Sequence, residues 1–190
     1  MAIELDRIGW EDAPSEQTPI DSGNLKQMEN NAEKAINQLL KLLSTNMTLY
    51  NKSTHTYNHT GSNANLEEPI VFDYSSGNPG NLLSKQNWGI KIGAGINHIN
   101  VKANVLIRLG QNNQGTDIYV TIRKNGEKLS EGNFYQTGLG PWTYHIYSEY
   151  LEVQEGDLIE LWLAGSNADI NVLDGGENIR QTQLTVEVVD

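Results

Sequence analysis

Residues 98–109 read His-Ile-Asn-Val-Lys-Ala-Asn-Val-Leu-Ile-Arg-Leu, and this stretch decides the fold class. From Ile99 to Leu109 every second residue is apolar, and most residues between them are polar. Successive side chains of a β-strand point to opposite faces of the sheet. The pattern therefore predicts a half-buried strand with one face toward an apolar core and one toward solvent.

Shorter stretches of the same alternation follow along the chain, at 118–122, 142–146, 151–153, 159–163 and 183–189. Asn125-Gly126 separates two of them, and this pair favours a type I′ hairpin because both residues tolerate positive φ. Short strands with turns every 8–12 residues or so are typical of a β-sandwich or jelly roll. We expect such a head domain over residues 70–190.

A different period precedes the strands, over residues 21–50. Apolar or small residues recur there at alternating spacings of three and four, with one polar interruption: Leu25, Met28, Ala32, Ala35, Leu39, Leu42, Asn46 and Leu49. This heptad seam predicts a coiled-coil helix, in which Asn46 would help to set register. The seam does not decide between two, three or four helices, and an amphipathic helix packed on its own domain is the alternative.

The segments on either side of this helix lack such periodicity. Residues 1–20 contain Pro14 and Pro19, which favour extended backbone, and also Trp10 and Ile20. An extended apolar segment needs a surface to lie on, either its own helix or a partner, and a disordered tail is the alternative. Residues 51–69 are rich in Asn, Ser and Thr, and we expect a polar linker there.

Composition narrows the range of functions. The net charge is −11, which disfavours nucleic acid and anionic membranes as partners. The chain has no cysteine, so thiolate catalysis and cysteine-based zinc sites are excluded. The sequence has no apolar stretch of the roughly 20 residues that a membrane helix needs, nor a recognisable secretory signal. We expect no membrane association and synthesis as a soluble protein in a cytoplasm.

Two groups of side chains raise the question of enzymatic or metal chemistry. His55 and His59 have a spacing that suits a metal on a helix, but they lie in the expected linker, where solvated side chains are the favoured interpretation. Several acidic residues gather between Glu149 and Glu160. A glycoside hydrolase needs two carboxylates about 5–9.5 Å apart across a cleft. Because these acids alternate along a strand and its turn, we interpret them as solvated charges and expect no catalytic residues, metal or cofactor.

Aromatic residues offer a further candidate site. Tyr135 and Trp142 flank a stretch with two glycines and a proline, and Tyr144 follows closely. Exposed aromatic rings can stack on the apolar faces of saccharides, so these three residues are candidates for receptor contact. The alternative is that the rings fill the core or a subunit interface.

The N-terminal part resembles a leader of tail and baseplate proteins from phages that infect Gram-positive bacteria. The resemblance rests on Trp10 to Ser15, then Thr18-Pro19-Ile20-Asp21, then Asn24-Leu25 and Met28-Glu29. It implies a virion protein whose residues Trp10, Pro14, Pro19 and Ile20 attach to another tail or baseplate protein.

Residues 70–190 resemble the trimeric jelly rolls of complement globular heads and tumour-necrosis-factor-type proteins. The resemblance rests on the strand 99–109, on the strand 118–122 with its Arg-Lys-Asn-Gly hairpin, and on Leu-x-Val-x-x-Gly-Asp-x-Ile-x-Leu over 151–161. It implies a homotrimer, for which we expect Leu158 and Trp162 to make contacts between subunits.

Together these features predict a mainly β protein, a homotrimer with a coiled-coil helix followed by a jelly-roll head. The predicted function is a non-enzymatic fibre or receptor-binding protein in the phage tail, which is assembled in the host cytoplasm. Its ligand would be host wall teichoic acid or another wall polysaccharide. A mainly structural fibre of the head, neck or collar is one alternative, and a cell-wall glycan hydrolase is another.

Overall fold

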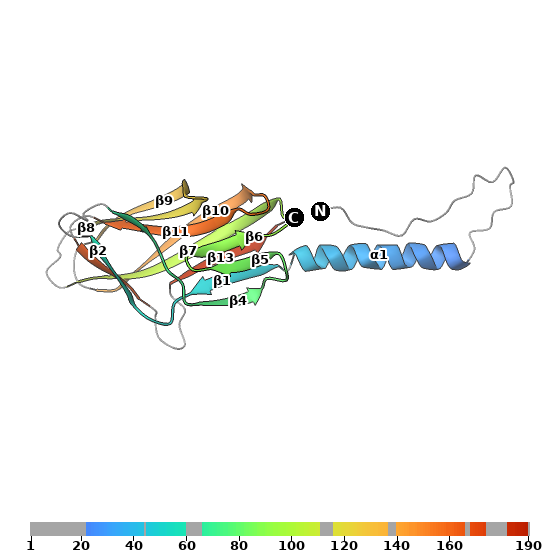
Figure 1. Ribbon diagram of the computed structural model, residues 1–190, viewed down its shortest axis with the longest axis horizontal. Coiled ribbons are helices and arrows are strands. Elements are labelled where there is room, and N and C mark those ends of the chain that lie inside the picture. The colour runs from blue at the N-terminus through green and yellow to red at the C-terminus, as the bar shows by residue number, and fades with distance from the viewer. Residues whose placement is uncertain are drawn as a thin grey trace.

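In the computed structural model, helix α1 (Ser22–Leu43) leads into a β-sandwich and extends away from it along the long axis of the molecule (Figure 1). The structure describes residues 22–43, 45–59, 66–110, 116–136, 140–165, 168–173 and 182–189. The predicted attachment residues Trp10, Pro14, Pro19 and Ile20 lie outside these ranges.

The first sheet has seven antiparallel strands around the long strand β7 (His98–Leu109). On one side of β7 the order runs through β13 (Gln183–Val188) and β1 (Asn46–Tyr50) to β4 (Tyr74–Asn78). Strand β12 (Ala168–Val172) pairs with the same edge of β7 as β13 does, but nearer the C-terminal end of β7. Strand β2 (His55–His59) pairs with β12. Strand β10 (Trp142–Glu152) pairs with the opposite edge of β7.

The second sheet has six strands in the order β5, β6, β11, β8, β9, with β3 also paired to β11. Their bounds are β3 (Glu67–Pro69), β5 (Leu83–Gln86), β6 (Gly89–Ile92), β8 (Thr116–Lys124), β9 (Glu127–Gln136) and β11 (Leu158–Gly165). Strands β3 and β6 meet different parts of β11, on the edge opposite β8.

The core lies between the two sheets and contains the apolar side of the predicted alternation. Val101 and Ile107 of β7 are fully buried there, as are Val120 of β8 and Leu161 of β11. Burial of such side chains from both sheets stabilises the sandwich by about 1.5–3 kcal/mol for each large aliphatic residue. The prediction of a mainly β sandwich is confirmed.

The hairpin between β8 and β9 also agrees with the sequence. Asn125 and Gly126 have φ values of 54° and 82°, as a type I′ turn requires. The Asn125 side chain stabilises the turn further, because its Nδ2 donates to Asp157 Oδ1 at 2.7 Å and its Oδ1 accepts from the Leu158 amide at 2.8 Å.

The predicted C-terminal end of the helix is wrong. The helix ends at Leu43 instead of continuing to residue 50, and Asn46 and Leu49 lie on β1. Met47 and Leu49 point into the core, and β1 pairs with β13 and β4 along its whole length. Two sheet partners and a buried face outweigh one further turn of an exposed helix.

The predicted linker and head boundary also need correction. Strands β2 and β3 lie within residues 51–69, so these two parts of the predicted linker belong to the sandwich. The head therefore begins at Asn46, where β1 begins, and not at residue 70.

Candidate functional site

The exposed seam of α1 is the first candidate surface. Leu25 and Met28 are each 46% exposed and Leu39 is 52% exposed, while Ala32 is exposed and Ala35 is half-buried. The side chain of Leu42 is not among those described. These positions repeat with the mean spacing of 3.5 residues that lets two or more helices pack together. The chain thus presents an apolar stripe on a helix that projects from the head.

The outer face of the seven-stranded sheet is the second candidate surface. The polar side chains of β7 point to this face, and pairing places them in rows across the sheet. Lys102 lies between Thr185 of β13 and Tyr147 of β10. In the next row, Asn104 lies between Gln183 and His145 of the same two strands.

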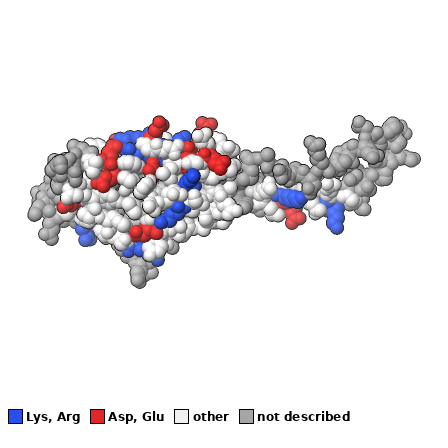
Figure 2. Space-filling model, in the orientation of Figure 1, with Lys and Arg blue, Asp and Glu red and all other residues white. Residues whose placement is uncertain are grey.

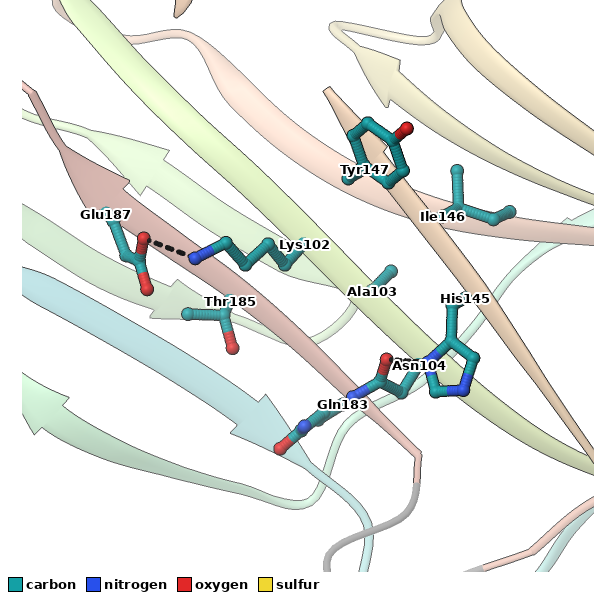
Figure 3. Close-up of a pocket in the computed structure, with 9 residues that line it drawn as sticks. All are labelled: Lys102, Ala103, Asn104, His145, Ile146, Tyr147, Gln183, Thr185 and Glu187. Atoms are coloured by element: carbon teal, nitrogen blue, oxygen red, sulfur yellow. Dashed lines mark hydrogen bonds and ion pairs between the residues drawn. The ribbon is translucent and has the colours of Figure 1, made fainter. Parts of the chain in front are cut away.

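A groove of about 390 Å³ runs between these rows (Figure 3). Its lining residues are Lys102, Ala103, Asn104, His145, Ile146, Tyr147, Gln183, Thr185 and Glu187. The Lys102 Nζ lies 2.9 Å from Glu187 Oε2, and His145 Nδ1 lies 2.6 Å from Asn104 Oδ1. Since an amide oxygen only accepts, the histidine donates this bond.

Two exposed tyrosines lie along β10, and the first of them, Tyr147, lines the groove. Tyr147 is 67% exposed and Tyr150 is 65% exposed. A β-bulge between Ser148 and Leu151 gives Tyr150 a φ of 51° and stacks its ring on His98, with 4.3 Å between ring centroids. The Tyr150 amide donates to Asn100 Oδ1 at 2.8 Å, which supports this unusual backbone. Bulges commonly redirect a side chain, and this one keeps two tyrosines on the same face.

The part of this outer face between β4 and β7 carries few charges. Three rows of outward-facing residues cross β4, β1, β13 and β7. The Lys, Arg, Asp and Glu residues in these rows are Lys102 and Glu187, which form an ion pair with each other. Tyr50 and Tyr74 stack at the far edge of the face, with ring centroids 5.8 Å apart. Tyrosine-rich, charge-poor patches are characteristic of the centre of protein interfaces.

The outer face of the six-stranded sheet is different. Arg123 pairs with Glu67, and its guanidinium lies 4.4 Å from the ring centroid of Trp162. Arg123 bonding holds the pKa of Glu67 below its ordinary value. Trp162 points away from the core as expected, but Arg123 covers its ring, and Leu158 on the same strand is half-buried. Acidic and basic side chains are interspersed over the visible surface of the head (Figure 2).

The three predicted receptor-contact residues do not form one cluster. Tyr135 is 66% exposed and pairs with Asp117 on the outer face of the six-stranded sheet. Tyr144 points inward and packs against the core, in agreement with the alternative that these rings fill the core. Its hydroxyl donates to Gln136 Oε1 at 3.0 Å, and burial raises its pKa. The ring is half-buried, and Phe134 lies against it in a tilted arrangement with 4.0 Å between centroids.

Trp142 stays exposed, at 47%, at the end of the head that lies away from the helix. On β10 it pairs with Ile107 of β7. Asn46, which lies near the helix, pairs with Glu187 of β13, and Glu187 in turn pairs with Asn100 of β7. Seven residues of β7 separate these two positions, which is about 23 Å at 3.3 Å per residue. We call the end with Trp142 the distal end of the head.

The strands keep the two candidate metal-binding histidines apart, and the candidate acidic residues bond to backbone amides in turns. His55 and His59 lie four residues apart on β2, so about 13 Å divides them. His55 Nε2 lies 3.4 Å from Asp73, whereas His59 is buried. Asp157 accepts from the Gln154 amide at 3.0 Å and Glu160 from the Gly126 amide at 2.9 Å, so both carboxylates brace turns. Within the described ranges, no group of three or more His, Cys, Asp or Glu side chains could hold a metal.

Sequence reasoning missed the groove. The alternation of residues 98–109 identified the polar positions of β7, but Thr185 and Tyr147 come from strands far away in the sequence. The period of each strand tells which side chains share its outer face. It does not tell which strands are neighbours, so no local signal could have found the groove.

Comparisons with known proteins identify the fold. No family model matches the chain, and no curated protein matches it. The crystal structure of murine APRIL at pH 5.0 is similar, with a TM-score of 0.51, 12% identity, and coverage of 76% of this chain and 98% of that one. A second crystal structure of murine APRIL, at pH 8.0, has a TM-score of 0.49, 13% identity, and coverage of 76% and 100%. The described helix is not apolar enough to cross a membrane. At this identity the likeness concerns the fold alone: the head is a β jelly roll similar in fold to murine APRIL.

Proposed function

We propose that this chain is a non-enzymatic virion protein of a phage tail or baseplate, which forms a homotrimeric fibre and adsorbs to host wall polysaccharide. Residues 1–20 attach to another tail or baseplate protein, α1 forms a three-stranded coiled coil, and the head projects outward. The observation that carries the proposal is the exposed apolar seam on a helix that leads directly into the head. The leader resemblance supports the virion location.

The helix supports self-association for an energetic reason. Leu25, Met28 and Leu39 remain about half exposed in the single chain, which leaves much apolar area in water. Burying that area against other copies is favourable by about 25 cal/mol per Å². An isolated helix of this kind gains most of its stability from such packing.

The head supplies a second contact surface on the outer face of the seven-stranded sheet. Its exposed tyrosines and its groove suit a partner of complementary shape, and the paired Lys102 and Glu187 leave little net charge to desolvate. Strand β1 belongs to this sheet and follows the helix almost immediately. The threefold axis of the coiled coil can therefore coincide with the threefold axis that relates the heads.

The oligomeric state tests this architecture. Light scattering on the full chain after size exclusion should give about 63 kDa, three times the chain mass of 21.1 kDa. Leu39→Asp and Tyr147→Asp should each shift the protein toward the monomer, because a carboxylate would be buried without a partner. Tyr135→Asp is the matched control, since Tyr135 is equally exposed on the other sheet. A monomeric, dimeric or tetrameric wild type contradicts the proposal.

The distal end supports the adhesive part of the proposal. Trp142 is exposed there, at the end of the head opposite the helix that would form the coiled coil. Gln136 Nε2 donates to the Gly140 carbonyl at 3.2 Å, which steadies the backbone beside Trp142. An amphipathic ring on a fixed backbone suits the apolar face of a sugar.

Binding to cell walls tests that role. Labelled full-length protein is titrated onto purified walls of Gram-positive cells, with and without their teichoic acid. Trp142→Ala should weaken binding by about tenfold or more, as expected for a central aromatic contact. Trp88→Ala is the control, because Trp88 is 43% exposed in the turn between β5 and β6. Equal loss in both variants contradicts a distal site, and wall clearing on a zymogram contradicts the non-enzymatic assignment.

A further inference from the structure

His59 is a buried titratable residue that the proposed function does not use. It ends β2 at the distal end of the head, is fully buried, and pairs with Ala168 of β12. Its Nδ1 accepts a hydrogen bond from the Gly165 amide of β11, at 3.2 Å. An imidazole nitrogen that accepts carries no hydrogen, so the neutral ring has its hydrogen on Nε2.

The other ring nitrogen has no such partner. Nε2 is buried and makes no hydrogen bond with the described residues. The nearest charged group is Glu68 of β3, whose Oε1 lies 3.6 Å away, beyond hydrogen-bonding range. A buried donor without an acceptor is costly. Among the described residues, the ring is therefore hydrogen-bonded on the Gly165 side and lacks a hydrogen bond on the Glu68 side.

Two carboxylates on neighbouring strands influence this ring electrostatically. They are Glu68 from β3 and Asp169 from β12. Burial lowers the pKa of His59, and both carboxylates oppose that shift. The Gly165 amide also favours the neutral ring, because it needs the lone pair of Nδ1. His55, at the other end of β2, faces Asp73 and not His59.

We propose that His59 is an acid-sensitive contact that holds β2 to the end of β11. When Nδ1 takes a proton from solvent, two donors face each other across the 3.2 Å contact with Gly165, and the bond is lost. The charged ring then pairs with Glu68 through Nε2. Among the described strands β2 pairs with β12 alone, so loss of this contact loosens the edge of the sheet at the distal end.

Amide hydrogen exchange of the full chain, followed by NMR between pH 7.5 and 5.0, tests this inference. After correction for the intrinsic pH dependence, protection of the Gly165 amide should fall in the wild type as the pH is lowered, because the protonated ring no longer accepts its hydrogen bond. In His59→Gln it should stay constant, since a glutamine oxygen can accept from Gly165 but does not titrate. His55→Gln is the matched control and should behave like the wild type.

The tautomer of His59 gives a test that needs no variant. Ring ¹⁵N shifts at pH 7.5 should show hydrogen on Nε2 and a bare Nδ1. Glu68→Gln should move the titration of His59 to lower pH, because the charged ring loses its counter-ion. Hydrogen on Nδ1 at pH 7.5, or the same loss of protection in His59→Gln as in the wild type, would overturn the inference.

Discussion

Leu49→Ala tests where the head begins. Leu49 is fully buried on β1, between β13 and β4, although its heptad position also fits the coiled-coil seam. The substitution removes three carbon atoms, which is about 2.4 kcal/mol at 0.8 kcal/mol per group. A residual cavity adds to this cost, so we expect a loss of about 3 kcal/mol in the free energy of unfolding.

Urea denaturation followed by the circular dichroism of the strands measures this loss. In thermal unfolding, a change of about 3 kcal/mol should lower the melting temperature by roughly 6–12 °C in a chain of this size. Leu39→Ala is the matched control, because Leu39 is exposed on α1. It should weaken association and leave the unfolding of the head nearly unchanged at low protein concentration.

The opposite result would refute the reasoning. If Leu49→Ala weakened association while the head unfolded at the same urea concentration, Leu49 would belong to the seam between helices. The helix would then extend past Leu43, and the pairing of β1 with β13 would be wrong.

Three further substitutions have expected outcomes. Gly126→Ala should destabilise the head by about 1 kcal/mol in thermal unfolding, because its φ of 82° disfavours a side chain although nothing lies within 4 Å of the new Cβ. Tyr144→Phe should cost about 1 kcal/mol through the lost bond to Gln136, and should leave wall binding unchanged. The pKa of Glu67 is lowered by Arg123, so its contribution to stability is present above its ordinary value of 4.5 and is lost as pH falls through the folded pKa. Stability curves of wild type and Glu67→Gln should therefore converge in acid, and a constant gap would contradict this origin.

Much of the fold is predictable from local patterns. The alternation around Val101 places its neighbours on two faces, because the period of a strand is a property of its own backbone. The positive φ of Asn125 and Gly126 follows from the few residue types that tolerate it. The predicted helix is likewise present, with its apolar seam exposed along α1.

Other features depend on neighbours that the sequence does not name. Asn46 and Leu49 fit both a heptad and a strand, and pairing with β13 decides between them. The polar strand β2 lacks a clear alternation, because it lies at a sheet edge and pairs with one other strand among those described. Tyr144 is partly shielded from solvent by Phe134 and bonded to Gln136, both of which lie on a different strand.

The sequence by itself determined the strands with a clear alternation (β7, β8, β10, β11 and β13), where one tight turn lies and which face of β7 is polar, since these are properties of short segments. Only the tertiary structure decided where the helix stops, how the bulge turns Tyr150 outward, and that Lys102, Tyr147 and Thr185 border one groove. These features arise where strands that are distant in sequence compete for the same partners, and that competition is settled by burial and pairing across the whole sandwich.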